Sequence, residues 1–127
     1  MKNNNPLSPH IQIYNWHISS LVSISHRISG VINYLFFIFL GIWICFSFLF
    51  PENYFIFEIF FNSFFGKLFT ISIIWSFMFQ ILSEVRHLFW DLGYGFDLKI
   101  SNFTGLCVIL GSFILTIVIF YVGKILI

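Results

Sequence analysis

The chain has 127 residues, of which 59% are hydrophobic and 9% are charged, and its formal net charge is +1. Soluble domains have about 45–50% apolar and about 25% charged residues, so this chain has too few charged side chains to cover a water-facing surface. The composition therefore predicts an integral membrane protein of one domain, and the near-neutral charge excludes a polybasic surface for nucleic acid.

The predicted elements are a polar arm followed by three apolar spans. Residues 1–20 form the arm, in which Pro6 and Pro9 oppose helix formation. We expect transmembrane helices over about 21–50, 64–90 and 100–124, because each span can cross roughly 30 Å of hydrocarbon. A connecting loop that contains Glu58 and Asn62 is expected between the first two spans. The predicted fold class is an all-α membrane protein, with residues 1–127 as a single domain.

Charge and codon-related composition bear on the location of the chain. The arm and the loop between the second and third spans share one side, and they carry more of the basic residues than the other side: Lys2, Arg27, Arg86 and Lys99 against Lys67 and Lys124. The positive-inside rule then places the N-terminus in the cytoplasm or matrix.

Phenylalanine, isoleucine and asparagine are abundant and alanine is absent, which suggests an AT-rich genome such as a mitochondrial or endosymbiont one.

A polar group marks the entrance to the first span. Ser23 and Arg27 are one helical turn apart and share a face, and His26 is also one turn from Ser23. The guanidinium fork and the hydroxyl could together hold a carbonyl oxygen or a carboxylate at the membrane boundary. The alternative is a simple interfacial anchor, in which the arginine only fixes the helix entrance.

A polar stripe marks the end of the second span. Its members Gln80, Glu84, His87 and Asp91 are spaced by four, three and four residues, so they share one helix face. Polar groups at membrane depth usually face a bundle interior or a functional cavity. The alternative, a helix end that emerges into water, explains Gln80 least well. Arg86 lies off this face, where a partner subunit or a lipid phosphate could pair with it.

The stripe and the first polar group are expected on the same side of the membrane. The antiparallel order of the first two spans puts Arg27 and His87 at similar depth, which favours one shared site. No nucleophile–base pair, phosphate loop or HExxH motif is present, and Cys45 and Cys107 are not part of a CxxC or Cys/His cluster. The sequence therefore predicts neither a hydrolase nor a metal site built by this chain alone, and no catalytic residue is assigned.

Two segments together resemble a known family. LSPHIQIYNWHISSLVSISHRISGV is similar to the entry segment of the cytochrome b membrane-anchor subunit of succinate dehydrogenase, respiratory complex II. EVRHLFWDLGYG is similar to the same family's motif at the end of its second helix, and the resemblance covers essentially the whole chain.

The resemblance implies a subunit that is not catalytic alone but belongs to a succinate:quinone oxidoreductase. Its implied partners are an iron–sulfur subunit, a flavoprotein subunit and a second small membrane-anchor subunit, with which it would form a bundle among lipids. FAD and iron–sulfur clusters in the partners would pass electrons to ubiquinone. The implied quinone-binding residues are Ser23, Ile24, Arg27 and the upstream Trp16. The implied location is the mitochondrial inner membrane, with an organelle-encoded subunit, or the bacterial plasma membrane.

The resemblance also implies haem b, but one residue departs from the family. The family's axial histidine lies seven residues before the histidine of the Arg-His pair, and Gln80 occupies that position here. Glutamine is a poor axial ligand for haem iron compared with imidazole. Glu84 also replaces a family glycine, whereas His26, Arg27 and His87 match positions near the haem. The site is then empty, filled by lipid, or holds a haem ligated by the partner subunit, with His87 as a more distant substitute ligand.

Three other functions remain open from the sequence. A fumarate reductase anchor would run the same architecture in reverse, and direction depends on the quinone and the soluble subunits. A purely structural anchor would lack quinone chemistry, which the intact Ser23 and Arg27 disfavour. A small channel or transporter subunit would need a path of polar groups across all three spans, and the first and third spans have none.

Overall fold

The chain forms three long helices and a short helical connection. The computed structural model describes residues 17–126, apart from the side chains of residues 53 and 126. Its long helices are α1 (Ile18–Leu49), α3 (Phe64–Asp91) and α4 (Leu98–Leu126), and a 3-10 turn η2 (Pro51–Asn53) and helix α2 (Tyr54–Asn62) join α1 to α3. All three long helices are apolar and long enough to cross a membrane, which confirms the predicted all-α fold class.

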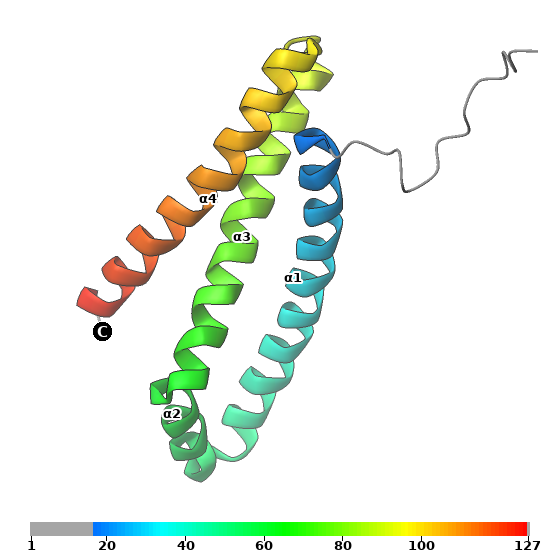
Figure 1. Ribbon diagram of the computed structural model, residues 1–127. Helices are drawn as coiled ribbons and strands as arrows, with labels where there is room; N and C mark the ends of the chain where they lie inside the picture. The colour runs from blue at the N-terminus through cyan, green and yellow to red at the C-terminus, as the bar shows by residue number, and fades with distance from the viewer. Residues whose placement is uncertain (1–16, 127) are drawn as a thin grey trace, which may run out of the picture.

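The arrangement of the helices gathers polar segments at one end of the bundle. Helix α3 runs antiparallel to α1 and lies between α1 and α4, while α2 lies at the opposite end from the first turn of α1 (Figure 1). Helix α4 packs on α3 near the turn that joins them and diverges from it toward the C-terminus (Figure 1). The first turns of α1, the last turns of α3 and the first turns of α4 therefore share one end.

The core is small and each long helix contributes to it. Val22 of α1, Phe79 of α3 and Val108 of α4 form the buried apolar cluster. Most other buried side chains are small and polar, which lets helix backbones approach closely inside a membrane: Ser29, Asn33, Ser76, Ser83, Ser101, Ser112 and Thr116. Large apolar side chains are mostly exposed on the isolated chain, as expected for helices that face lipid or partner helices.

The prediction of a loop between the first two spans was wrong. Glu58 and Asn62, which were expected in this loop, both belong to helix α2. Proline is compatible with the first turn of a helix, and Pro51 stands at the first position of η2. No glycine or proline follows until Gly66, and a helix satisfies backbone groups that irregular chain would leave unpaired near lipid.

Glycines shape both connections. Ser63 caps α3 by accepting a hydrogen bond from the Gly66 backbone N–H at 3.1 Å, and a Cβ on Gly66 would overlap the Phe60 carbonyl. In the turn between α3 and α4, Gly93 and Gly95 have φ values of +86° and +85°, a region that side chains disfavour. These two features fix where α3 begins and how α4 returns.

We expect Gly66→Ala to lower the thermal unfolding temperature of the assembled complex. The added methyl group has no room beside the α2 backbone, and overpacking of this kind costs about 1–3 kcal/mol. Differential scanning fluorimetry of the purified complex measures the change. Gly41→Ala is the matched control, since nothing lies within 4 Å of its added Cβ. Equal unfolding temperatures for the two variants would contradict the steric argument.

Candidate functional site

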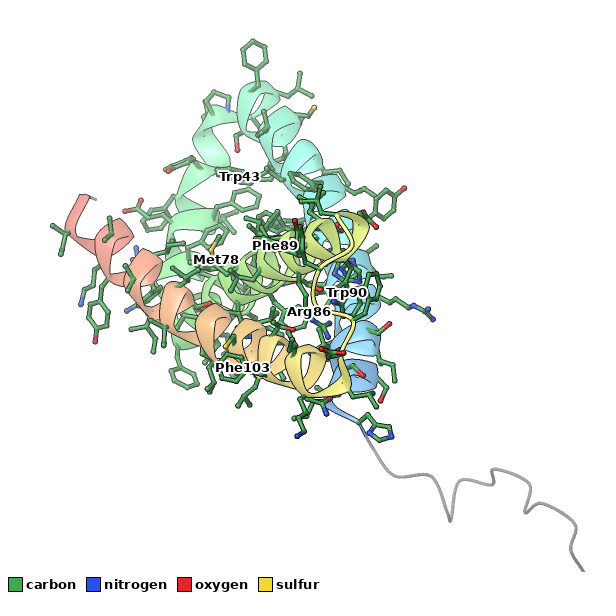
Figure 2. All side chains as sticks on the ribbon, turned by 90° about the horizontal axis from the view of Figure 1, so that it is seen from above. Trp43, Met78, Arg86, Phe89, Trp90 and Phe103 are labelled. Carbon is green, nitrogen blue, oxygen red and sulfur yellow. The ribbon has the colours of Figure 1, made fainter. Side chains whose placement is uncertain are left out.

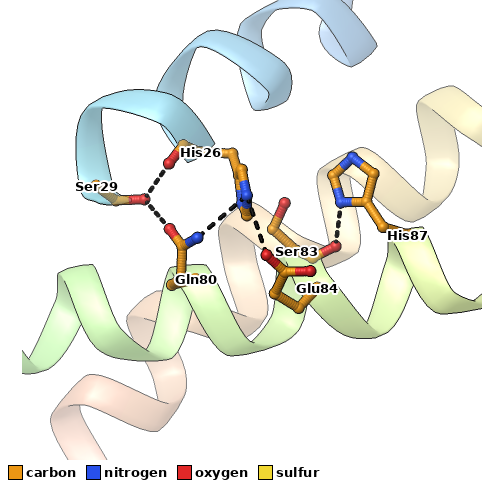
Figure 3. A network of polar contacts seen from close by, with 6 residues as sticks. All are labelled: His26, Ser29, Gln80, Ser83, Glu84 and His87. Carbon is orange, nitrogen blue, oxygen red and sulfur yellow. Dashed lines mark hydrogen bonds and ion pairs between the residues drawn. The ribbon is translucent and has the colours of Figure 1, made fainter. Parts of the chain in front are cut away.

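A polar network joins α1 to α3 inside the bundle (Figure 3). Helix α1 supplies His26 and Ser29, which are three residues apart and therefore on one face. Helix α3 supplies Gln80 and Glu84, which are four residues apart on the facing surface. The predicted face of the second span thus turns toward the first span and not only toward water.

Hydrogen bonds connect these four side chains in sequence. The Ser29 hydroxyl lies 2.7 Å from Gln80 Oε1 and 3.0 Å from the carbonyl oxygen of His26, and its single hydrogen can be donated to either acceptor. Gln80 Nε2 lies 3.1 Å from His26 Nε2, and the same ring nitrogen lies 3.2 Å from Glu84 Oε1. One hydroxyl, one amide, one imidazole and one carboxylate therefore lie within 3.2 Å of one another in sequence.

His26 Nε2 has two possible partners but only one proton or lone pair to offer. Without a proton it accepts from the Gln80 amide, and with a proton it donates to the Glu84 carboxylate. The buried Nδ1 of His26 has no partner among the described residues. The two arrangements differ in whether Nε2 carries a hydrogen, so the partner of His26 depends on the tautomer of its ring.

His87 extends the network on the same side. Its ring centroid lies 5.2 Å from that of His26, and its Nδ1 lies 2.8 Å from the Ser83 carbonyl. Since a carbonyl only accepts, His87 Nδ1 carries a hydrogen and, in the neutral ring, Nε2 keeps the lone pair. Trp90 packs edge-on against the same ring, with centroids 5.4 Å apart.

Exposure increases along the network. Ser29 is 2% exposed, the His26 side chain is 21% exposed and the Glu84 side chain is 57% exposed. The network therefore runs from a buried hydroxyl to an exposed carboxylate, and carboxylates and imidazoles are the groups that transfer protons in acid–base chemistry.

The structure brings most of the predicted site residues to one end of the bundle. Gln80, Glu84 and His87 meet α1 through His26, whereas Asp91 is exposed and its side chain has no hydrogen bond or ion pair to any described residue. Arg27 and His87 were predicted to lie at similar depth in the membrane, and the residue of α1 whose ring lies beside His87 is His26, which precedes Arg27.

The remaining predicted residues lie on the same turns of α1 but outside the network. Ser23 is half-buried, while Ile24 and Arg27 are exposed. The side chains of Ser23 and Arg27 have no hydrogen bond to any described residue in this chain. Trp16 lies outside the described residues.

Sequence reasoning missed two residues that the tertiary structure makes important. Ser29 is the buried partner of Gln80, and its position one turn after His26 was the available signal. Arg86 was predicted to lie off the polar face, where a partner subunit or a lipid phosphate could pair with it. In the structure it is 5% exposed and donates to Ser101 and Thr104 of α4. The spacing of those two α4 residues, three apart and polar within an apolar span, was the signal for that contact.

Gln80 and the residues around it are not suited to act as an axial ligand of haem iron. The Gln80 amide is engaged at both ends, by Ser29 and by His26, and it offers no imidazole. Glu84 also contacts His26, so both residues that depart from the family pattern belong to the same network. No cluster of three or more His, Cys, Asp or Glu residues able to hold a metal ion occurs in the described part of the chain.

The three apolar spans and the polar network at one end of them define a polytopic membrane subunit of the all-α class. Residues 1–119 match the family described as succinate dehydrogenase/fumarate reductase transmembrane subunit. The chain belongs to this family, as the two sequence motifs predicted.

Several proteins that are similar to the chain are named as cytochrome b subunits of succinate dehydrogenase. The chain is 37% identical over 117 residues to the succinate dehydrogenase cytochrome b556 subunit of Rickettsia felis, with 92% of this chain and 91% of that protein covered. It is 27% identical over 124 residues to the cytochrome b556 subunit of Paracoccus denitrificans, with 95% of each covered. It is 36% identical over 111 residues to the cytochrome b560 subunit of Marchantia polymorpha, with 78% and 76% covered.

Proposed function

We propose that this subunit anchors succinate dehydrogenase in the membrane and forms part of its quinone-binding site. Electrons from succinate reach the site through the flavoprotein and iron–sulfur subunits, and a second small anchor subunit completes the bundle. Family membership and the names of the similar proteins support the assignment to the complex.

One observation carries the quinone site. Ser23 and Arg27 lie one turn apart on α1, on the turns that also carry His26 of the proton-bearing network. Neither side chain has a hydrogen-bond partner among the described residues, so both keep donors free for a ligand. The exposed Ile24 between them provides an apolar surface for the quinone ring.

These groups suit the reduction of a quinone. Reduction to the quinol adds two electrons and two protons, and negative charge develops on the quinone oxygens. The Arg27 guanidinium stabilises that charge, and the Ser23 hydroxyl donates to a quinone oxygen. Glu84 and His26 provide an adjacent source of protons, because they are linked by the 3.2 Å contact.

A fumarate reductase anchor is the second candidate, because the matched family description includes both enzymes. The same site would then bind a quinol, whose two electrons would pass through the iron–sulfur and flavoprotein subunits to fumarate while its two protons leave. A purely structural anchor is less consistent with free donors at Ser23 and Arg27. In each case the membrane is one that carries a respiratory chain, the bacterial plasma membrane or the mitochondrial inner membrane, with the N-terminus on the cytoplasmic or matrix side.

Ser23→Ala tests the quinone site. We expect the KM for a short-chain ubiquinone to rise roughly fivefold, the effect of losing a hydrogen bond of about 1 kcal/mol, while succinate oxidation with a soluble dye is unchanged. Ser25→Ala is the control, because it removes a hydroxyl from another face of the same turn. Equal KM values for the two variants would contradict a quinone contact at Ser23.

A further inference from the structure

Arg86 is a buried cation that joins α3 to α4 (Figure 2). Its Nη2 donates to the Ser101 carbonyl and hydroxyl, each at 3.0 Å, and its Nε donates to the Thr104 hydroxyl at 3.2 Å. The Trp90 ring lies 4.1 Å from the guanidinium carbon. These contacts hold the guanidinium in a fixed orientation.

The positive charge of Arg86 is not balanced within the described chain. No carboxylate of the described residues lies within 4.0 Å of its guanidinium nitrogens. The ion pair among the described residues joins His26 to Glu84 instead. All its acceptors are neutral, and Nη1 has no acceptor among the described residues. Buried charges in membrane proteins are usually paired, so an anionic partner is expected.

An apolar groove leads to this cation from the lipid-facing surface. It has a volume of about 600 Å³ and runs between α3 and α4. Its lining is apolar apart from a few groups, and Arg86 is its charged member: Leu82, Val85, Arg86, Phe89, Trp90, Tyr94, Gly95, Ile100, Thr104, Cys107 and Val108. The groove therefore combines a cation at depth with walls suited to a hydrocarbon chain.

The position of the groove corresponds to the boundary of the membrane. Arg86 is five residues before the end of α3, which is about 7 Å along the helix axis. The exposed charged residues Asp91, Asp97 and Lys99 lie at the end of α3, in the turn and at the start of α4. An interfacial phosphate is thus within reach of the guanidinium, while a chain attached to it extends along α3 and α4.

We propose that this groove binds an anionic phospholipid, whose phosphate accepts from Arg86 and whose acyl chain lies against Leu82, Phe89 and Cys107. A guanidinium recognises phosphate oxygens as a charge-assisted donor, and the Tyr94 hydroxyl, which also lines the groove, is available for a second bond at the same end. A quinone is neutral and would leave the charge of Arg86 unbalanced. The inference requires only that the helices span a membrane, so it does not depend on the proposed quinone site.

Native mass spectrometry of the intact complex tests the groove. The complex is reconstituted in nanodiscs of phosphatidylcholine with 20% phosphatidylglycerol, released, and its bound lipids are identified by mass. We expect one phosphatidylglycerol per copy of this subunit that resists delipidation. We expect Arg86→Gln to lose that adduct, and Arg86→Lys to retain it with at least tenfold weaker affinity.

A second variant blocks the groove without removing the bonds between α3 and α4. Cys107→Trp places a large ring in the groove, and Leu110→Trp places the same ring on the exposed face of α4 outside it. We expect Cys107→Trp to lose the lipid and Leu110→Trp to keep it. Retention of the adduct in both variants would overturn the proposal. A quinone mass in place of the phospholipid, or a wild-type complex with no retained lipid because a partner helix fills the groove, would also overturn it.

Discussion

Replacing Arg27 with alanine is expected to reduce the succinate:quinone reductase activity of the complex by about 10²-fold, the effect typical of losing one donor to a developing oxyanion. Arg27 is exposed at the proposed quinone site and makes no hydrogen bond to the described chain. Its removal should therefore affect the quinone reaction without disturbing the fold. The measurement is kcat/KM for a short-chain ubiquinone with succinate as the donor.

Two controls separate this effect from poor assembly. Succinate oxidation with a soluble dye acceptor should stay at the wild-type rate, because the flavoprotein and iron–sulfur subunits perform it. Lys99→Ala removes an exposed cation from the same end of the bundle and should leave both activities unchanged. A parallel loss of dye and quinone activity in Arg27→Ala would assign Arg27 to assembly.

The second large effect concerns the haem position. We expect the wild-type complex to show no low-spin b-type signal in a reduced-minus-oxidised spectrum, because Gln80 is bonded to Ser29 and His26 and provides no imidazole. The double variant Gln80→His with Glu84→Gly restores the family residues at both positions. We expect it to gain a stoichiometric b-type signal, with a pyridine haemochrome assay as the measure.

Gln80→Asn with Glu84→Gly is the matched control for the haem experiment. It removes the same carboxylate but supplies no imidazole, so its spectrum should equal that of the wild type. A stoichiometric low-spin signal in the wild type would show that another residue ligates the iron. An unchanged spectrum in the double variant would show that position 80 is no longer able to reach a haem.

The network that holds Gln80 also explains the two departures from the family pattern. Both Gln80 and Glu84 contact His26 Nε2, so they act on one atom. A glutamine at membrane depth would be costly without partners, and Ser29 and His26 supply them. Position 80, where the resemblance implies the axial ligand, thus carries a hydrogen-bonded group that ties α1 to α3, and the exposed Glu84 lies next to this group.

The sequence alone predicted the fold class and the family. Three charge-poor spans can only be helices in a membrane, since a spanning segment must satisfy its own backbone groups. The spacing of Gln80, Glu84 and His87 placed them on one face of α3 by helix geometry alone. The connection between α1 and α3 could not be predicted in this way, because a helix at the boundary and a loop have similar polar residues.

Only the tertiary structure decided which residues become partners. Spacing along one helix does not specify which face of a neighbouring helix it meets, so Ser29 as the partner of Gln80 followed from the packing of α1 on α3. The partners of Arg86 also followed only from the packing, since the sequence suggested a partner subunit or a lipid phosphate for this residue. Its burial against Ser101 and Thr104 depends on the return of α4 through the glycine turn. The sequence thus determined the helices and the chemistry they carry, while the packing of the helices determined which of these side chains meet.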